Sequence, residues 1–219
     1  MIRHAVFSFS VAAATTALLL FLPAGTIRYW QAWVFMALFF IPMAFIALYL
    51  FKCCPELLER RLYTKEKESG QGILSKLFYV SVCLVFVISC LDRRFSWSSV
   101  PLGVIVVSEA VFLAGYFFLF LVFRENKYLD HTVVVVAGQE VVATGPYSIV
   151  RHPMYLSELI MFVFAPVSLG SYWAVTSNLL LIMILVIRIL TEEGLLLREL
   201  KGYREYTQKT KYRLVPGIW

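Results

Sequence analysis

The side chains best suited to chemistry lie in the last hundred residues of the sequence. Arg151 and His152 stand directly before Pro153, a residue that favours the first turn of a helix. Cationic side chains beside the free N–H groups of a helix start make a site for a carboxylate or a phosphate. Two aromatic residues, Tyr147 and Tyr155, flank this triplet and offer ring faces to a base or to a cation.

A pair of acidic residues, Glu192 and Glu193, follows after a long apolar stretch. Carboxylates there would accept hydrogen bonds from an amine or a ribose, or would balance a cation. Together with the Arg-His pair and the two tyrosines, they predict a site for a zwitterionic, aromatic and partly cationic ligand. A plainer interpretation stays open on residue types alone, because basic residues and tyrosines gather at the membrane boundary of many proteins.

The elements that must position these side chains are membrane helices. The chain has 219 residues, of which 60% are hydrophobic and 16% charged, and its mean hydropathy is +0.77. A soluble domain carries about 25% charged residues, so the composition excludes a water-soluble domain as well as a disordered chain. Four cysteines are too few for a disulfide scaffold. The net charge of +6 fits loops that face anionic lipid better than it fits nucleic-acid binding.

Apolar runs long enough to cross a bilayer predict the individual helices. We expect four spans followed by a helical hairpin whose turn contains Gly170. The fold class is therefore all-α integral membrane, with four transmembrane helices plus the hairpin and a small cytoplasmic C-terminal segment. The expected ranges are 5–22, 30–51, 77–91, 100–123, 154–169 and 173–190.

The distribution of Lys and Arg predicts how the chain is oriented. With the N-terminus inside, only Arg28, Arg93 and Arg94 of the 20 Lys and Arg residues would lie outside. Because basic residues concentrate in cytoplasmic loops, we expect both termini in the cytoplasm.

Two further acidic residues fall inside the predicted spans. Glu109 is either a functional group, a hydrogen-bonding partner of a neighbouring helix, or a residue near the outer membrane interface. Glu158 follows Arg151 on the helix that begins at Pro153, and we favour a simple pair within that helix over a contact with a ligand.

Two separated blocks of the sequence resemble the signature of a known family. The first runs from Gly145 through Tyr147 and the Arg-His-Pro triplet to Tyr155, and the second begins at the Glu pair and ends at Gly217. In this order, with a hairpin between them, the blocks are similar to the isoprenylcysteine carboxyl methyltransferase family, which is related to membrane phospholipid methyltransferases. The resemblance covers residues 124–219.

The resemblance implies a membrane methyltransferase whose cofactor, S-adenosylmethionine (SAM), is held between the membrane helices and the C-terminal segment. It divides the chain into N-terminal transmembrane helices, 1–123, and a methyltransferase-like catalytic region, 124–219, that contains the loop, the hairpin, a C-terminal helix and the tail. The acceptor would be a lipid-like, lipidated or small hydrophobic molecule that enters from the bilayer and is methylated on a carboxylate, an amine or a thiol.

The site residues are carried over from the same resemblance. Arg151 would orient or activate the acceptor, and Glu192 or Glu193 could act as base for an amine or a thiol. Many relatives have histidine where this sequence has Gln139, so a backbone contact is expected there. The residues expected to bind the cofactor are Gln139, Val141, Val142, Gly145, Tyr147, His152, Pro153, Tyr155 and Glu192.

Two other interpretations fit the sequence. A membrane reductase of the sterol reductase type would bind NADPH, and Arg198, Arg204 and Arg213 could hold its 2′-phosphate. A non-catalytic membrane protein is the second. A small transporter would carry more polar residues in its spans than this sequence has, but a relative that has lost its activity stays open.

Overall fold

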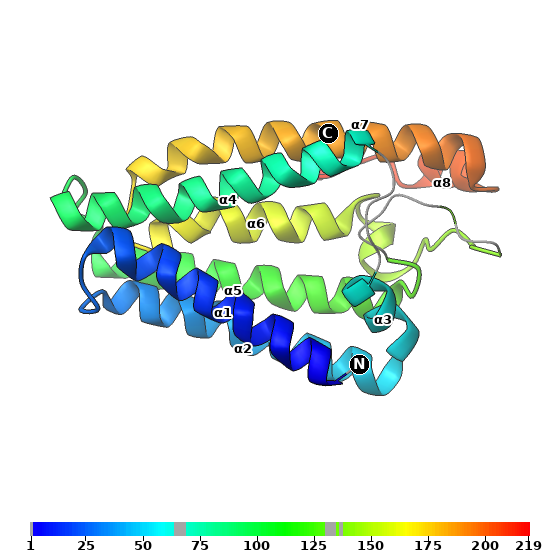
Figure 1. Cartoon of the computed structure of the whole chain (residues 1–219). Coiled ribbons are helices and arrows are strands. Elements are labelled where there is room, and N and C mark those ends of the chain that lie inside the picture. Colours follow the sequence, from blue (N-terminus) through cyan, green and yellow to red (C-terminus); the bar gives the residue numbers. More distant parts are fainter. Residues whose placement is uncertain (1, 64–68, 130–134, 136–137) are drawn as a thin grey trace.

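The chain folds into a bundle of long helices (Figure 1). The structure is a computed structural model that describes residues 2–63, 69–129, 135 and 138–219. Within these residues every regular element is helical, which confirms the predicted all-α class. The elements are α1 (Ile2–Ala24), α2 (Trp30–Cys53), α3 (Pro55–Tyr63), α4 (Ser69–Phe95), α5 (Leu102–Glu125), η1 (Gly145–Ser148), α6 (Pro153–Ser168), η2 (Trp173–Ser177), α7 (Asn178–Glu199) and α8 (Tyr203–Lys209).

The long helices run back and forth, so the connections gather at the two ends of the bundle. One end carries the start of α1, the short helices α3 and α8, and the segment that leads into α6 (Figure 1). The connections after α1, α4 and α6 lie at the opposite end (Figure 1). The polar C-terminal residues and the N-terminus therefore share one end of the molecule.

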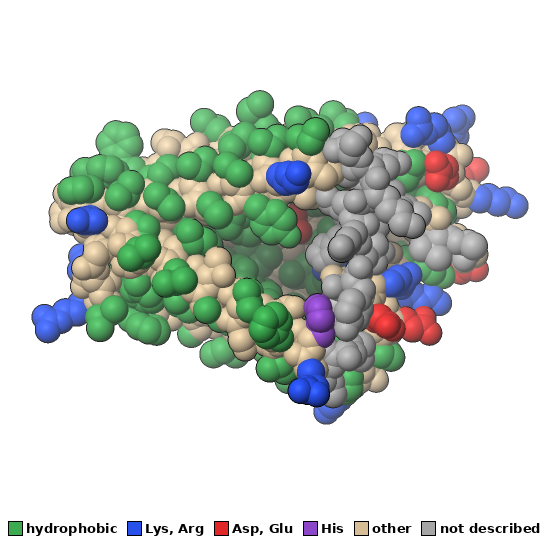
Figure 2. Space-filling model, viewed as in Figure 1, with side chains coloured by type: hydrophobic (Ala, Val, Ile, Leu, Met, Phe, Trp, Pro, Cys, Tyr) green, Lys and Arg blue, Asp and Glu red, His purple; other side chains and the backbone are tan. Residues whose placement is uncertain are grey.

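Five helical segments are long and apolar enough to cross a membrane in the part of the chain that the structure describes. Charged side chains collect toward the two ends of the bundle, and hydrophobic side chains cover the surface between them (Figure 2). Phe45 of α2 is 58% exposed and Phe117 of α5 is 64% exposed. Apolar surface of this extent belongs in lipid, so the chain is an integral, multi-pass membrane protein. The segments are Arg3–Ala24, Trp30–Cys53, Gly72–Phe95, Leu102–Glu125 and Trp173–Glu199.

All of the predicted helices are present, but several begin or end elsewhere. α4 extends well beyond the expected 77–91, because Lys76 and Asp92 continue the helix past its apolar middle. The hairpin is formed by α6 and α7, which are joined through η2. Helix α3 lies between the expected spans 30–51 and 77–91, where no helix was predicted. Its short amphipathic sequence is too polar to form an apolar run.

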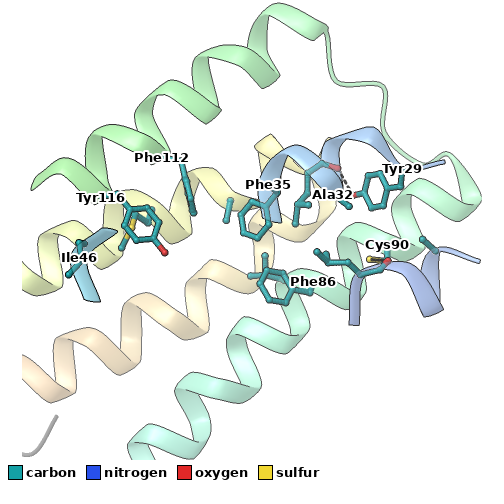
Figure 3. Packing of buried hydrophobic residues seen from close by; sticks show 14 of the residues in the cluster. Tyr29, Ala32, Phe35, Ile46, Phe86, Cys90, Phe112 and Tyr116 are labelled. Carbon is teal, nitrogen blue, oxygen red and sulfur yellow. Dashed lines mark hydrogen bonds between the residues drawn. The ribbon is translucent and has the colours of Figure 1, made fainter. Parts of the chain in front are cut away.

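An aromatic core holds α2, α4 and α5 together (Figure 3). Phe35 of α2 packs against Phe86 of α4 and Phe112 of α5, with ring centroids 5.6 and 5.2 Å apart. The hydroxyl of Tyr29 donates a hydrogen bond of 2.5 Å to the carbonyl of Leu169, which ties the start of α2 to the end of α6. In lipid such close packing and buried hydrogen bonds replace the exclusion of water as the stabilising interactions between helices.

The close contact of α5 with α6 sets the position of the site. Gly115 of α5 faces Met161 of α6, and a Cβ atom at position 115 would lie only 2.7 Å from the Cγ atom of Met161. Small residues at such a crossing let the two backbones approach closely. The first turn of α6 is thereby fixed beside the end of α5.

α1 and α4, in contrast, touch along only part of their length. The thiol of Cys90 donates to the carbonyl of Leu20 at 2.8 Å, near the last turns of both helices. Toward the N-terminal end the two helices diverge, and the surface between them is hollowed, with mostly hydrophobic side chains around an acidic one (Figures 1 and 2). This side of the bundle is open to the surrounding lipid.

Candidate functional site

A cavity of about 100 Å³ lies at the end of the bundle that carries α8. Its wall combines tyrosine rings, aliphatic side chains and a few polar groups from the end of α5, the following segment, η1, α6, α7 and α8. The lining residues are Asn126, Tyr128, Leu129, Gln139, Glu140, Val141, Val142, Tyr147, Arg151, Met154, Tyr155, Glu192, Leu196, Leu200, Tyr203 and Tyr206.

The structure brings most of the predicted site residues together around this cavity. Those that line it are Gln139, Val141, Val142, Tyr147, Arg151, Tyr155 and Glu192. Gly145, His152, Pro153 and Glu193 lie nearby but do not form part of its wall.

Hydrogen bonds of the hydroxyl groups hold three of the tyrosine rings in the wall of the cavity. The hydroxyl of Tyr147 accepts from the amide of Asn126 at 2.8 Å, and that of Tyr155 donates to Glu192 at 2.8 Å. The hydroxyl of Tyr206 donates to the carbonyl of Tyr147 at 2.7 Å. Burial raises the pKa of Tyr147, and it raises the pKa of Tyr206 to about 12. Both phenols are therefore neutral at physiological pH.

Gly145 places Tyr147 by allowing a turn that other residues resist. It has a φ of +56°, in the left-handed region that glycine adopts without strain. A Cβ atom here would also lie 3.0 Å from the carboxyl carbon of Glu125, which accepts a hydrogen bond from Thr144. The role of Gly145 in the structure is thus to shape the chain before the cavity.

Glu193 lies behind the cavity at the centre of an ion-pair cluster. Its Oε1 accepts from Nε of Arg151 at 2.5 Å, and its Oε2 accepts from Nε of Arg213 at 2.6 Å. Nε2 of His152 is 3.4 Å from Oε1, and it has no hydrogen-bond partner within the described residues. The anion beside the Arg-His pair in this structure is therefore the protein's own carboxylate.

The same arginine binds the C-terminal tail. Nη1 of Arg151 donates to the carbonyls of Thr210 and Lys211, at 2.9 and 2.8 Å. The backbone N–H groups of Arg151 and His152 donate to the next two carbonyls of the tail, both at 2.9 Å. The tail is thus held across the start of α6 and behind the wall of the cavity.

The comparison with known proteins addresses this region directly. Residues 105–198 match the isoprenylcysteine carboxyl methyltransferase (ICMT) family. The family resemblance is therefore confirmed over this part of the chain, and the fold agrees with a membrane methyltransferase. The match begins in α5 and ends in α7, so it includes every predicted site residue but neither α8 nor the tail. No curated protein matches the chain significantly.

The ICMT match also contains Glu158, for which the expected pairing is wrong. The guanidinium of Arg151 is turned toward Glu193 and the tail, so Glu158 has no such pair within its helix. Its charge instead interacts with those of Arg188, Arg61 and Glu192, which come from α7 and α3.

Several residues of the site were not predicted from the sequence. Asn126, which holds the hydroxyl of Tyr147, is the first polar residue after α5. Tyr203 and Tyr206 lie three residues apart, on one face of α8. That spacing was the available signal, but a helix of seven residues gives too weak a pattern to assign a buried face.

Proposed function

We propose that this ICMT-family protein transfers a methyl group from SAM to a hydrophobic acceptor that enters from the bilayer. The observation that carries the proposal is the cavity, whose wall contains tyrosine rings, aliphatic side chains and the carboxylate of Glu192. Within the described residues this carboxylate has the hydroxyl of Tyr155 as its hydrogen-bond partner and no ion pair. Aromatic faces beside an unbalanced negative charge suit a cationic ligand with an aromatic base.

The residues of the cavity fit the two halves of SAM. When bound, SAM supplies a methyl group attached to a positively charged sulfur, which a nucleophile can take up. Val141, Val142 and Leu196 would contact the base, and Glu192 would balance the positive charge. Ligand cavities usually measure about 300–1,000 Å³, so binding would widen the cavity of about 100 Å³ seen here.

The surroundings of the two acidic residues favour different roles for them. Both oxygens of Glu193 are bound by arginines, which makes this carboxylate a poor proton acceptor. Glu192 faces the cavity, so it is the better candidate to take the proton of an amine or a thiol. Arg151 also lines the cavity, with its Nε fixed by Glu193, and we assign it to orienting the acceptor.

Access from the bilayer is supported by the shape of the bundle. The hollow between α1 and α4 opens on the side that faces lipid, near the middle of the bundle (Figures 1 and 2). An acceptor with a long apolar part could lie there with its reactive end toward the cavity. We place the end of the molecule that carries the cavity, with both termini, in the cytoplasm because most Lys and Arg residues flank it.

No observation favours NADPH as the ligand. Arg198 and Arg204 are exposed, and Arg213 is bound to Glu193. Of the described residues that line the cavity, Arg151 alone is basic. A 2′-phosphate would need more positive charge than this wall presents.

Calorimetric titration of the detergent-purified protein with SAM, and separately with NADPH, tests the proposal. Micromolar binding of SAM that is lost in Glu192→Gln supports it. Glu199→Gln is the matched control, because Glu199 lies on the same helix but is exposed. Binding of NADPH alone would refute the proposal. Transfer of a labelled methyl group to membrane extracts would then separate the acceptors, because methyl esters are labile to alkali whereas N-methyl and thioether products are not.

A further inference from the structure

One buried hydroxyl in the wall of the cavity has no hydrogen-bond partner among the residues that the structure describes. The side chain of Tyr203 is 4% exposed, and its Oη atom is buried without a hydrogen bond in the described part of the chain. The hydroxyls of Tyr147, Tyr155 and Tyr206 in the same wall are all hydrogen-bonded. Among the described tyrosines of this wall that are buried, Tyr203 is therefore the one whose hydroxyl has a bond still to form.

Such a group is unfavourable unless a ligand satisfies it. A buried polar atom without a partner loses its bonds to water and gains nothing in return. Its oxygen has lone pairs that can accept a hydrogen bond from a ligand. Because Tyr203 lines the cavity, a ligand in the cavity is the natural source of that hydrogen bond.

The charges around Tyr203 indicate which part of a ligand would lie beside it. Glu193, Glu192 and Arg151 all interact with its phenol group. Two of these three groups are carboxylates and one is a guanidinium, and Glu192 has no ion pair within the described residues. The local balance is therefore negative, which favours a positively charged donor over an anion.

We infer that the hydroxyl of Tyr203 and the carboxylate of Glu192 together bind the ammonium group of the methionine half of SAM. The ammonium donates one N–H to the phenol oxygen and interacts with Glu192 as its counter-charge. Val141, Val142 and Leu196 are then left for the base, as proposed above. This assignment rests on the proposed use of SAM and names the residue that recognises its amino-acid part.

Three ligands separate this assignment from other roles of Tyr203. SAM and S-adenosylhomocysteine both carry the ammonium group, although only SAM has a charged sulfur. Methylthioadenosine has the same nucleoside but no amino-acid part. We expect Tyr203→Phe to weaken binding of the first two ligands by the same factor, about tenfold, and to leave methylthioadenosine unchanged. Tyr212→Phe, at an exposed tyrosine outside the cavity, is the control and should change none of the three.

The melting temperature of the ligand-free protein provides the second measurement. Removing an unsatisfied hydroxyl should leave it unchanged or raise it. Equal loss of all three ligands, no loss of any, or a melting temperature lowered by several degrees would each overturn the assignment. A wild-type protein that binds methylthioadenosine and S-adenosylhomocysteine but not SAM, or none of the three, would refute the proposed function itself.

Discussion

Replacing Glu193 by Gln should destabilise the protein without altering the wall of the cavity. The carboxylate accepts charge-assisted hydrogen bonds from Arg151 and Arg213, at 2.5 and 2.6 Å, and is 5% exposed. A glutamine keeps one acceptor oxygen, but its NH₂ group would face the second guanidinium, donor against donor. The substitution also leaves Arg151, itself 9% exposed, without a counter-charge.

The expected loss of stability follows from these contacts. Hydrogen bonds to charged groups contribute about 1.5–3 kcal/mol each, and breaking a buried ion pair costs about 3–5 kcal/mol. Because the side chain of Arg213 is 35% exposed, its share is screened by water. We therefore expect a loss of about 3 kcal/mol, which lowers Tm by about 6–12 °C in a chain of this size.

Thermal unfolding in detergent, followed by tryptophan fluorescence, measures the change. Limited trypsin digestion reports on the tail, because the carbonyls of Thr210 and Lys211 are bound by the same Arg151. Glu192→Gln is the matched control. It should cost only about 1.5 kcal/mol, because it weakens a single hydrogen bond to a carboxylate and breaks no ion pair within the described residues. If the two variants melt together, or if the tail of Glu193→Gln resists trypsin as the wild type does, the reasoning is wrong.

Three further predictions follow from the packing and the buried tyrosines. Gly115→Ala should destabilise the protein by about 1–3 kcal/mol in the melting assay, because the added Cβ atom would clash with Met161. Gly103→Ala is the control. It has no atom near the added Cβ, so it should be neutral or stabilising in the same assay. Gly145→Ala should weaken SAM binding in calorimetry, because it strains the turn that places Tyr147. Burial raises the pKa of Tyr206 from 10.0 to about 12, so the folded state keeps a proton that the unfolded chain releases. The free energy of unfolding should therefore fall between pH 10 and 12, by at most about 1.4 kcal/mol per pH unit for this group. Denaturant titrations across that range measure the change. An exposed phenol would give no such fall.

Much of the fold could be predicted because membrane helices are marked by their composition. A run such as 30–51 is too long and too apolar to be anything but a span, and α2 indeed covers Trp30–Cys53. Polar residues inside a helix weaken this signal, which is why the prediction for α4 stopped before Asp92. α3 escaped prediction because nine amphipathic residues in a loop make no such run.

The candidate site shows where information from the sequence ends. The cluster of Arg151, Tyr147 and Tyr155 was predicted as a unit because the three residues are close in the chain and flank a helix start. Their partners Asn126 and Tyr206 come from other elements, and only packing brings them near. Polar residues that act through distant partners are invisible to a search for local motifs.

The acidic pair on α7 makes the same point within two residues. Successive side chains on a helix point about 100° apart, so Glu192 and Glu193 cannot both face the cavity. Which of them does so depends on how α7 is rotated against α6, and the sequence does not contain that angle in any local pattern. The structure turns Glu192 to the cavity and Glu193 to the two arginines. One acidic motif thus supplies a group that lines the cavity and a group that holds the tail, and exchanging their positions would require rotating the whole helix.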